Sequence, residues 1–322
     1  RNERSSEILF ESFLTLSNEK IYCSNRILNL KIFYHNTESS HLFFEMFLFK
    51  NEKFEIKAKF YVNINASGSL RIRCILSLDA YYTEKIYPEL NINPRKDHSE
   101  ENEILRIKEF KLKFLFLKVH SITNIANEFT DFQEINQVTD QISKLNKNNQ
   151  ISLLRHFRFG DQFQLHDCNK SHYFYFKDFW QNYPKSIDVS TGDFNLKILP
   201  ELKGAEFDFK DDETHRLGFW IDESNYLLKM GMSLSSTFLI DFSGLHNNLK
   251  DFKNYSEESI SCVDLDYFNS TKAYKYIHPK RDSPTEQYEK LMPSALSSFI
   301  DDRERNRAYG HMNFGDWYGE SG

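Results

Sequence analysis

The chain has 322 residues, a net charge of −6 and a pI near 6.0. This acidic balance leaves no basic field for nucleic acid or for an anionic membrane surface, so neither is expected as a partner. Apolar residues make up 40% of the chain, and its 30 Phe and 17 Tyr favour strands over helices. No apolar run approaches the roughly 20 residues of a membrane-spanning helix.

Strands are predicted first at residues 27–34 and 42–49. A longer pair follows at 54–64 and 70–78, where apolar and polar side chains alternate with period two. The loop between them, "NASGS" at 65–69, contains a glycine that can adopt positive φ, which is typical of a hairpin. These segments predict an antiparallel sheet with one buried face.

Residues 107–119 predict a third long strand, because Phe and Leu alternate with Lys there. The polar residues of 88–104 predict a connection, and the Asn, Gln and Lys of 133–152 predict a long loop or a weak helix. Shorter strands are expected at 194–199, 215–221 and 236–242. Because helices and strands do not alternate as they do around a parallel sheet, the prediction for residues 1–280 is one large antiparallel β-sandwich.

A convincing helical segment is predicted only near the end, at residues 283–307. Ser283 and Pro284 form a signal for the start of a helix. Pro293 is expected to end or kink this helix before a second one runs on to about residue 305. Residues 281–322 therefore predict the start of a separate helical domain.

One aromatic stretch in the middle of the chain has the composition of a binding site. "FKDFWQNYPKSIDV", residues 176–189, contains Trp180 and Tyr183, which can stack on sugar rings, and Lys185, which can pair with a carboxylate. Composition alone favours the alternative of a strand and turn in which Phe179 and Trp180 are buried.

A second stretch of this kind closes the chain. "YGHMNFGDWYGE", residues 309–320, contains glycines that let the backbone approach a ligand closely. Its Tyr309, His311, Asp316 and Trp317 supply an acid, a base, a hydrogen-bond acceptor and a stacking face. The alternative is a packing loop in which Trp317 belongs to the core.

Three further features are weaker signals. His215 and Arg216 stand at the head of a predicted strand, where they could bind a carboxylate. "RHFRFGD", residues 155–161, is expected to be a solvated face. "HDCNKSH", residues 166–172, does not supply the four ligands at defined spacing that a structural zinc needs, so no metal is predicted. No phosphate-binding or dinucleotide-binding fingerprint occurs in the sequence, and no cofactor is predicted.

Three of these stretches together resemble the fungal exo-rhamnogalacturonan lyases and their bacterial relatives. They are "FWQNYPKSI" at 179–187, "THRLGFWI" at 214–221 and "YGHMNFGDW" at 309–317. The resemblance implies a central β-sandwich that runs into a C-terminal α/α toroid, with only the first toroid helices present and the N-terminal barrel of the family absent. The chain would then be a fragment that is inactive and prone to aggregate by itself. It departs from the family pattern at His311, where the pattern has Trp.

The resemblance implies a polysaccharide lyase that cleaves rhamnogalacturonan by β-elimination beside a uronate. Such a reaction needs a cation to neutralise the carboxylate, a base for the C5 proton and an acid for the leaving oxygen. The cation could be Arg216 or Lys185. The base could be His215 or His311, and the acid could be Tyr309 or Tyr183.

Two alternatives remain open from the sequence. A glycoside hydrolase would use two carboxylates, for which Asp316 and Glu320 are candidates. A non-catalytic, carbohydrate-binding sandwich would bind a glycan without turnover. The expected partner of the lyase is an acidic polysaccharide, and such a substrate favours a secreted or cell-surface protein.

Overall fold

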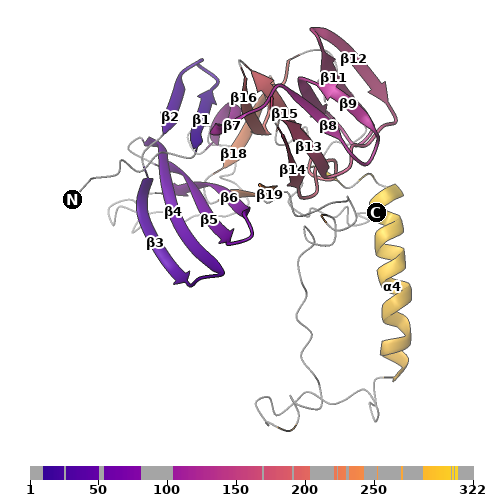
Figure 1. Ribbon diagram of the computed structural model, residues 1–322. Coiled ribbons are helices and arrows are strands. Elements are labelled where there is room, and N and C mark those ends of the chain that lie inside the picture. Colours follow the sequence, from indigo (N-terminus) through magenta and orange to yellow (C-terminus); the bar gives the residue numbers. More distant parts are fainter. Residues whose placement is uncertain are drawn as a thin grey trace, which may run out of the picture. The chain divides into compact units, whose positions relative to one another are not determined.

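The computed structural model describes two compact units, residues 1–252 with 309–322 and residues 253–308, each considered by itself. Within them the structure describes residues 10–24, 27–50, 54–80, 104–168, 170–190, 192–203, 221–222, 224–229, 232–242, 252, 270, 286–305, 307 and 309–310. The protein is mainly β, and the strands of the first unit form two large antiparallel sheets (Figure 1). The predicted fold class, an antiparallel sandwich followed by helix, is confirmed.

The first sheet has nine strands within the described part of the chain. In order across the sheet they are β3 (Ile27–His35), β4 (Ser39–Lys50), β5 (Phe54–Asn65), β6 (Ser69–Ala80), β19 (Ser233–Asp241), β14 (Ser171–Phe176), β13 (Gln162–His166), β8 (Ser121–Asn124) and β9 (Phe129–Phe132). The predicted hairpin is confirmed as β5 and β6, whose register runs from Ile64 opposite Leu70 to Phe54 opposite Ala80.

The second sheet has ten strands in the same described residues. Eight follow one path: β12 (Gln150–Arg155), β11 (Ile142–Lys147), β10 (Glu134–Gln137), β15 (Lys185–Ser190), β16 (Asp193–Leu199), β7 (Ile104–Lys118), β1 (Phe10–Leu16) and β2 (Ile21–Ser24). The other two are β18 (Asn225–Lys229), which pairs with β7, and β17 (Ile221–Asp222), which pairs with β18.

Phenylalanine rings join the two sheets in the core. Phe114 of β7 lies 5.6 Å from Phe194 of β16 and 5.8 Å from Phe238 of β19, measured between ring centroids. Phe174 of β14 lies 5.1 Å from Phe194. All four side chains are fully buried. Because β7 and β16 belong to one sheet and β14 and β19 to the other, these contacts stabilise the sandwich by burying large apolar surfaces.

The prediction of a loop or weak helix at residues 133–152 is wrong, because this segment contains β10, β11 and the start of β12. Three consecutive residues of β10, Ile135, Asn136 and Gln137, are buried, so polar side chains point into the protein on this strand. A strand that buries polar residues lacks the alternation of apolar and polar side chains by which strands are recognised. The connection predicted at 88–104 and most of the strand predicted at 215–221 lie outside the described residues.

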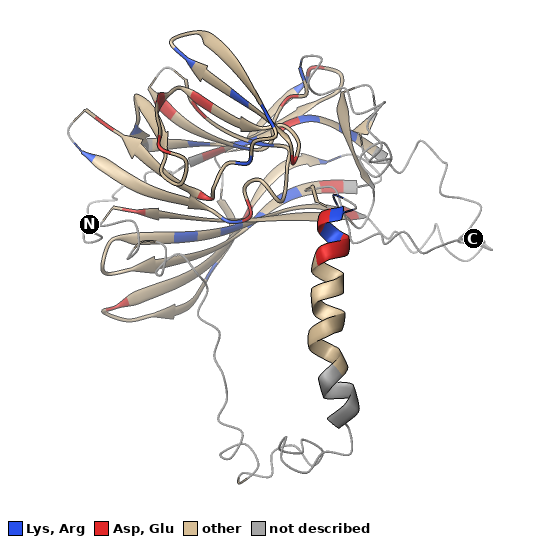
Figure 2. Ribbon diagram, turned by 90° about the vertical axis from the view of Figure 1, so that its right-hand side faces the viewer, with Lys and Arg blue, Asp and Glu red and all other residues tan. Residues whose placement is uncertain are grey.

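The second unit contains one helix in its described residues, α4 (Glu286–Arg305). The predicted end of the first helix at Pro293 is wrong, since α4 continues through this residue. A proline inside a helix removes one hydrogen bond, and the surrounding helix-favouring residues offset that cost. The charged residues of the last turns colour one end of the α4 ribbon in Figure 2. The large apolar side chains Leu291, Met292, Leu296, Phe299 and Ile300 are exposed. No described helix is long and apolar enough to span a membrane.

Candidate functional site

The turn between β14 and β15 carries Trp180 and is held by one carboxylate. The Oδ1 atom of Asp161 accepts a hydrogen bond from the backbone N–H of Phe179 at 2.9 Å, and Oδ2 accepts one from Asp178 at 3.1 Å. Phe179 is fully buried, with its ring 5.0 Å from that of Phe163. Asp161 thus fixes the two residues that precede Trp180. The Trp180 side chain itself is half-buried at the edge of the core.

Arg158, Trp180 and Tyr309 meet and form what we call the arginine–aromatic cluster. The guanidinium carbon of Arg158 lies 4.0 Å from the Trp180 ring centroid and 5.6 Å from that of Tyr309. The two rings are 4.8 Å apart and meet at 60°. The Arg158 side chain is 34% exposed, whereas Tyr309 is only 8% exposed. The cluster therefore presents a cation and part of an indole to solvent, with a tyrosine beneath them.

Tyr309 reaches the cluster because the next residue is tied to the Trp180 turn. The backbone N–H of Gly310 donates a hydrogen bond to the carbonyl of Gln181 at 2.7 Å. Gly310 has a φ of 113°, a backbone conformation that a residue with a Cβ rarely adopts. Two stretches far apart in the sequence are thus joined by one ring contact and one main-chain hydrogen bond.

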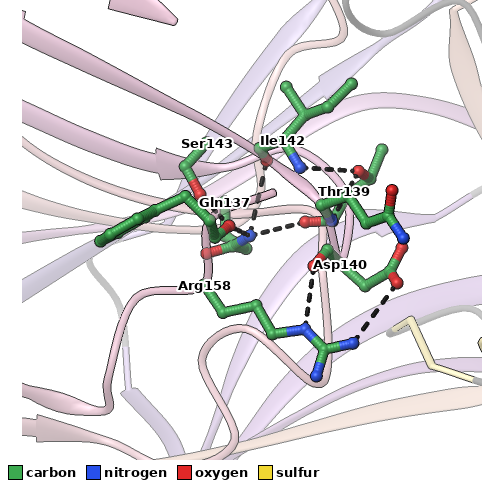
Figure 3. A network of polar contacts seen from close by, with 8 residues as sticks. Gln137, Thr139, Asp140, Ile142, Ser143 and Arg158 are labelled. Carbon is green, nitrogen blue, oxygen red and sulfur yellow. Dashed lines mark hydrogen bonds and ion pairs between the residues drawn. The ribbon is translucent and has the colours of Figure 1, made fainter. Parts of the chain in front are cut away.

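A buried acid holds the guanidinium of Arg158 in place (Figure 3). The Nε atom donates a hydrogen bond to the backbone carbonyl of Asp140 at 3.0 Å, and a terminal nitrogen lies 3.6 Å from the Asp140 carboxylate. The Asp140 side chain is fully buried. An anion at this position offsets part of the positive charge and fixes the direction of the side chain.

Gln137 fixes the backbone on both sides of Arg158 (Figure 3). Its Nε2 atom donates to the carbonyls of Thr139 at 2.6 Å and Phe157 at 3.1 Å, and its Oε1 atom accepts from the N–H of Phe159 at 2.9 Å. The Phe157 carbonyl also accepts a hydrogen bond from the Ser143 hydroxyl at 2.8 Å. Gln137 is fully buried, so leaving the Thr139 carbonyl and the Phe159 N–H without its amide would be costly. The position of Arg158 therefore depends on a polar network inside the protein.

A buried lysine lies under the same turn. Lys185 is fully buried, and its Nζ atom lies 4.1 Å from the Phe176 ring centroid, with no hydrogen-bond partner among the described residues. Burial lowers the pKa of Lys185 to about 7, although Asp178 and Asp161 act in the opposite direction. Burial also raises the pKa of Asp161 to about 6, against the two hydrogen bonds it accepts from the turn.

The structure brings together two of the predicted site residues, Trp180 and Tyr309. Tyr183 and Lys185 come from the same stretch, but both are fully buried beneath it. The other predicted site residues lie outside the described residues: His215, Arg216, His311, Asp316 and Trp317.

Sequence reasoning missed Arg158, which was expected to belong to a solvated face. The alternation of arginine and phenylalanine in "RHFRF" was the available signal, because Phe159 is buried and Arg158 beside it is not.

The two histidines of residues 166–172 belong to strands of the nine-stranded sheet, His166 to β13 and His172 to β14. The Nδ1 atom of His166 lies 2.9 Å from the Ser171 hydroxyl, and Nε2 lies 2.8 Å from the Thr123 hydroxyl. Burial lowers the pKa of both His166 and His172, which favours neutral imidazoles. Within the residues that the structure describes, no three potential ligands gather in a way that could hold a metal ion.

No protein-family model matches the sequence, and no curated protein matches it. Among solved structures, an aldose 1-epimerase-like protein from Klebsiella pneumoniae subsp. pneumoniae MGH 78578 aligns with a TM-score of 0.34 and 7% sequence identity. The alignment covers 72% of this chain and 62% of the Klebsiella chain, which is less than two thirds of the latter. A likeness of this extent assigns neither a fold family nor a function to this chain.

Proposed function

We propose that the protein is a carbohydrate-active β-sandwich protein that binds an acidic polysaccharide at the arginine–aromatic cluster and cleaves it by β-elimination. The observation that carries this proposal is the contact between Trp180 and Tyr309, which belong to two of the three stretches that resemble the exo-rhamnogalacturonan lyases. Arg158 adds a cation at the same point, 4.0 Å from the indole. A stacking ring beside a guanidinium suits a sugar that carries a carboxylate.

The roles follow from what each group offers chemically. Arg158 pairs with the uronate carboxylate and withdraws charge, which makes the adjacent C5 proton easier to remove. The Tyr309 hydroxyl donates a proton to the leaving oxygen, and His215 or His311 takes the C5 proton. Lys185 is buried, so in this scheme it supports the turn and Arg158 replaces it as the neutralising cation.

A non-catalytic carbohydrate-binding function is the second candidate. The observation that favours it is the composition of the cluster in its described part, where Asp140 is the carboxylate beside Arg158 and is fully buried. A buried, ion-paired acid is a poor general base, whereas stacking and charge pairing need no proton transfer.

The test is incubation of the protein in its natural full-length form with rhamnogalacturonan and with polygalacturonate, while the ultraviolet absorbance of an α,β-unsaturated carboxylate and new reducing ends are followed. Rising absorbance indicates an unsaturated uronide and supports the lyase. Reducing ends without absorbance would overturn it in favour of a hydrolase, and saturable binding without either product would leave only the binding function.

Three variants connect the outcome to the cluster. Arg158→Ala is expected to weaken polysaccharide binding about tenfold or more, because a charge-assisted pair is lost. Arg158→Lys keeps the positive charge but lacks the planar guanidinium, so it should keep part of the binding affinity that Arg158→Ala loses. Arg155→Ala, which removes an exposed arginine from β12 nearby in sequence, is the matched control and should change nothing. Equal binding by all three variants would contradict the proposal.

A further inference from the structure

A row of aromatic side chains crosses the outer face of the nine-stranded sheet. Phe33 of β3 lies 6.3 Å from Phe43 of β4, and Phe43 lies 4.9 Å from Tyr61 of β5, between ring centroids. Phe43 is opposite Tyr61 in the register, and Tyr61 is opposite Arg73 of β6. This first row therefore runs from an aromatic ring on the edge strand to an arginine three strands away.

A second row runs beside the first across the same four strands. Tyr34 is opposite His41, His41 is opposite Asn63, and Asn63 is opposite Arg71. The Tyr34 and His41 rings are 5.8 Å apart. It too begins with an aromatic side chain on β3 and ends with an arginine on β6. We call the two together the aromatic rows.

Several of these side chains are open to solvent. The exposed fractions are 63% for Phe33, 51% for Tyr34 and 43% for Tyr61. His41 and Arg73 are exposed as well. Four neighbouring strands span about 14 Å at the usual strand spacing, which is the length of a short oligosaccharide. Exposed aromatic rings at this density on one face indicate a binding surface.

The charges of this face favour an anionic ligand. Neither row contains a carboxylate, and the Nε atom of Arg73 donates to the neutral hydroxyl of Ser235 at 2.9 Å, so that bond leaves its charge in place. Of the acids on the same strands, Glu55 pairs with Lys57 and Asp79 pairs with Lys59. Glu45 of β4 accepts a hydrogen bond from the Asn29 side chain, and the register places Lys59 opposite it. The rows thus carry a local positive charge on a chain whose net charge is −6.

We infer that the aromatic rows are a second carbohydrate-binding surface, which takes an anionic oligosaccharide with its sugar rings stacked on Phe33, Tyr34 and Tyr61 and a carboxylate against Arg73. The ligand class is argued from the rows themselves, so the inference goes beyond the proposed function and does not depend on it. Two neighbouring strands, β19 and β14, separate β6 from β13, so the rows and the segment that carries Arg158 lie toward different ends of the sheet order (Figure 1).

Single-stranded nucleic acid also combines stacking with negative charge, but the surface fits it less well. A nucleic acid carries one phosphate per base, and its affinity comes mainly from many cations along the backbone. Here the nearby Lys57 and Lys59 are already paired with acids, and the chain is acidic overall. A polyuronate with hydroxyl groups matches the Tyr, Asn and His side chains between the arginines.

The test measures binding of tetragalacturonate by calorimetry in the Arg158→Ala background, where the arginine–aromatic cluster is impaired. Tyr61→Ala and Arg73→Gln are each expected to weaken binding about five- to tenfold, because stacking or a charge-assisted contact is lost. Ile151→Ala and Lys20→Gln, which remove an exposed apolar side chain and an exposed cation away from the rows, are the matched controls and should leave binding unchanged.

Each other outcome overturns the inference in a defined way. Equal binding of a neutral tetrasaccharide would remove the role of Arg73, and tighter binding of a thymidine oligonucleotide would reassign the surface to nucleic acid. If Tyr61→Ala and Arg73→Gln bind like the background protein, the rows are not a binding site. If Arg158→Ala abolishes tetragalacturonate binding, and Tyr61→Ala and Arg73→Gln have no effect in the original protein, the proposed function is supported and this second surface is rejected.

Discussion

The arginine–aromatic cluster and the aromatic rows use the same kinds of side chain, but the protein holds them in different ways. In the cluster, Arg158 depends on the buried Gln137 and Asp140, and Trp180 depends on a turn tied by Asp161. In the rows, strand register alone sets the neighbours, as with Tyr61 between Phe43 and Arg73. A site of the first kind is fragile but pre-organised, whereas a site of the second kind tolerates change and binds more loosely.

The largest expected loss of stability follows from truncating a ring in the core between the two sheets. Phe114→Ala removes a fully buried ring that contacts Phe194 in its own sheet and Phe238 in the other. We expect the free energy of unfolding to fall by about 3–5 kcal/mol, as for other buried aromatic truncations. Chemical denaturation measures the change, and Phe33→Ala on the exposed edge strand is the control. A loss below about 1 kcal/mol would mean that the two sheets do not share one core.

The buried network gives the next largest effect and separates the two sites. Gln137→Ala leaves the Thr139 carbonyl and the Phe159 N–H without the partner that Gln137 supplies, whereas the Phe157 carbonyl keeps the Ser143 hydroxyl, so we expect a loss of about 2–3 kcal/mol in unfolding free energy. Polysaccharide binding that depends on Arg158 should weaken with it, whereas binding at the rows should not. Gln150→Ala, at an exposed end of β12, is the control. Equal weakening at both sites would show that the network does not act through Arg158.

The same contrast explains how much of the fold the sequence predicts. Period-two alternation predicts β5, β6 and β7 correctly, because these strands bury one apolar face. It fails at β10, which buries Asn136 and Gln137, since polar residues in a core are recognised only from the partners that surround them. The helix α4 is predicted, but its continuity through Pro293 is not, because a local signal for a break competes with helix-favouring residues on both sides.

For the candidate site, composition marks the two aromatic stretches and the structure joins them at Trp180 and Tyr309. Arg158 is missed because its role depends on a ring contact with a residue from a different strand connection, which no local pattern encodes. The burial of Lys185 is missed for a related reason. A lysine beside a tyrosine and a tryptophan has the composition of a surface site, and only the fold reveals that it lies beneath one.

Lys185 and Asp161, both close to the Trp180 turn, predict that the stability of the protein depends on pH. Folding lowers the pKa of Lys185 from 10.5 to about 7, so the unfolded chain binds more protons in this window and stability should rise as pH rises from about 7 towards 10. Folding raises the pKa of Asp161 from 3.8 to about 6, so its contribution is largest at low pH and is lost as pH rises from about 4 to 6. The combined contribution of Lys185 and Asp161 to stability should therefore pass through a minimum between pH 6 and 7.

Lys185→Met tests this directly, because it replaces the buried amine with an apolar side chain of similar length. We expect the rise in melting temperature between pH 7 and 10 to disappear, while the profile below pH 6 stays like that of the original protein. Lys170→Met removes an exposed lysine just before β14 and should keep the profile of the original protein. A Lys185→Met profile that still rises above pH 7 would assign that rise to other groups.

The smallest expected effect on stability belongs to the edge of the aromatic rows. Tyr34 is 51% exposed on the edge strand β3, where its ring contacts His41 and its hydroxyl accepts a hydrogen bond from the Asn36 side chain at 2.6 Å. Because these contacts face solvent, Tyr34→Ala should change the unfolding free energy by no more than about 0.5 kcal/mol. Tetragalacturonate binding in the Arg158→Ala background should nevertheless fall, since a stacking ring is lost. Tyr34→Phe keeps the ring and loses only the hydroxyl, so it should keep most of the binding. If Tyr34→Ala lowers stability as much as it lowers binding, the edge ring belongs to the packing of the sheet, and the difference drawn between the two sites no longer holds.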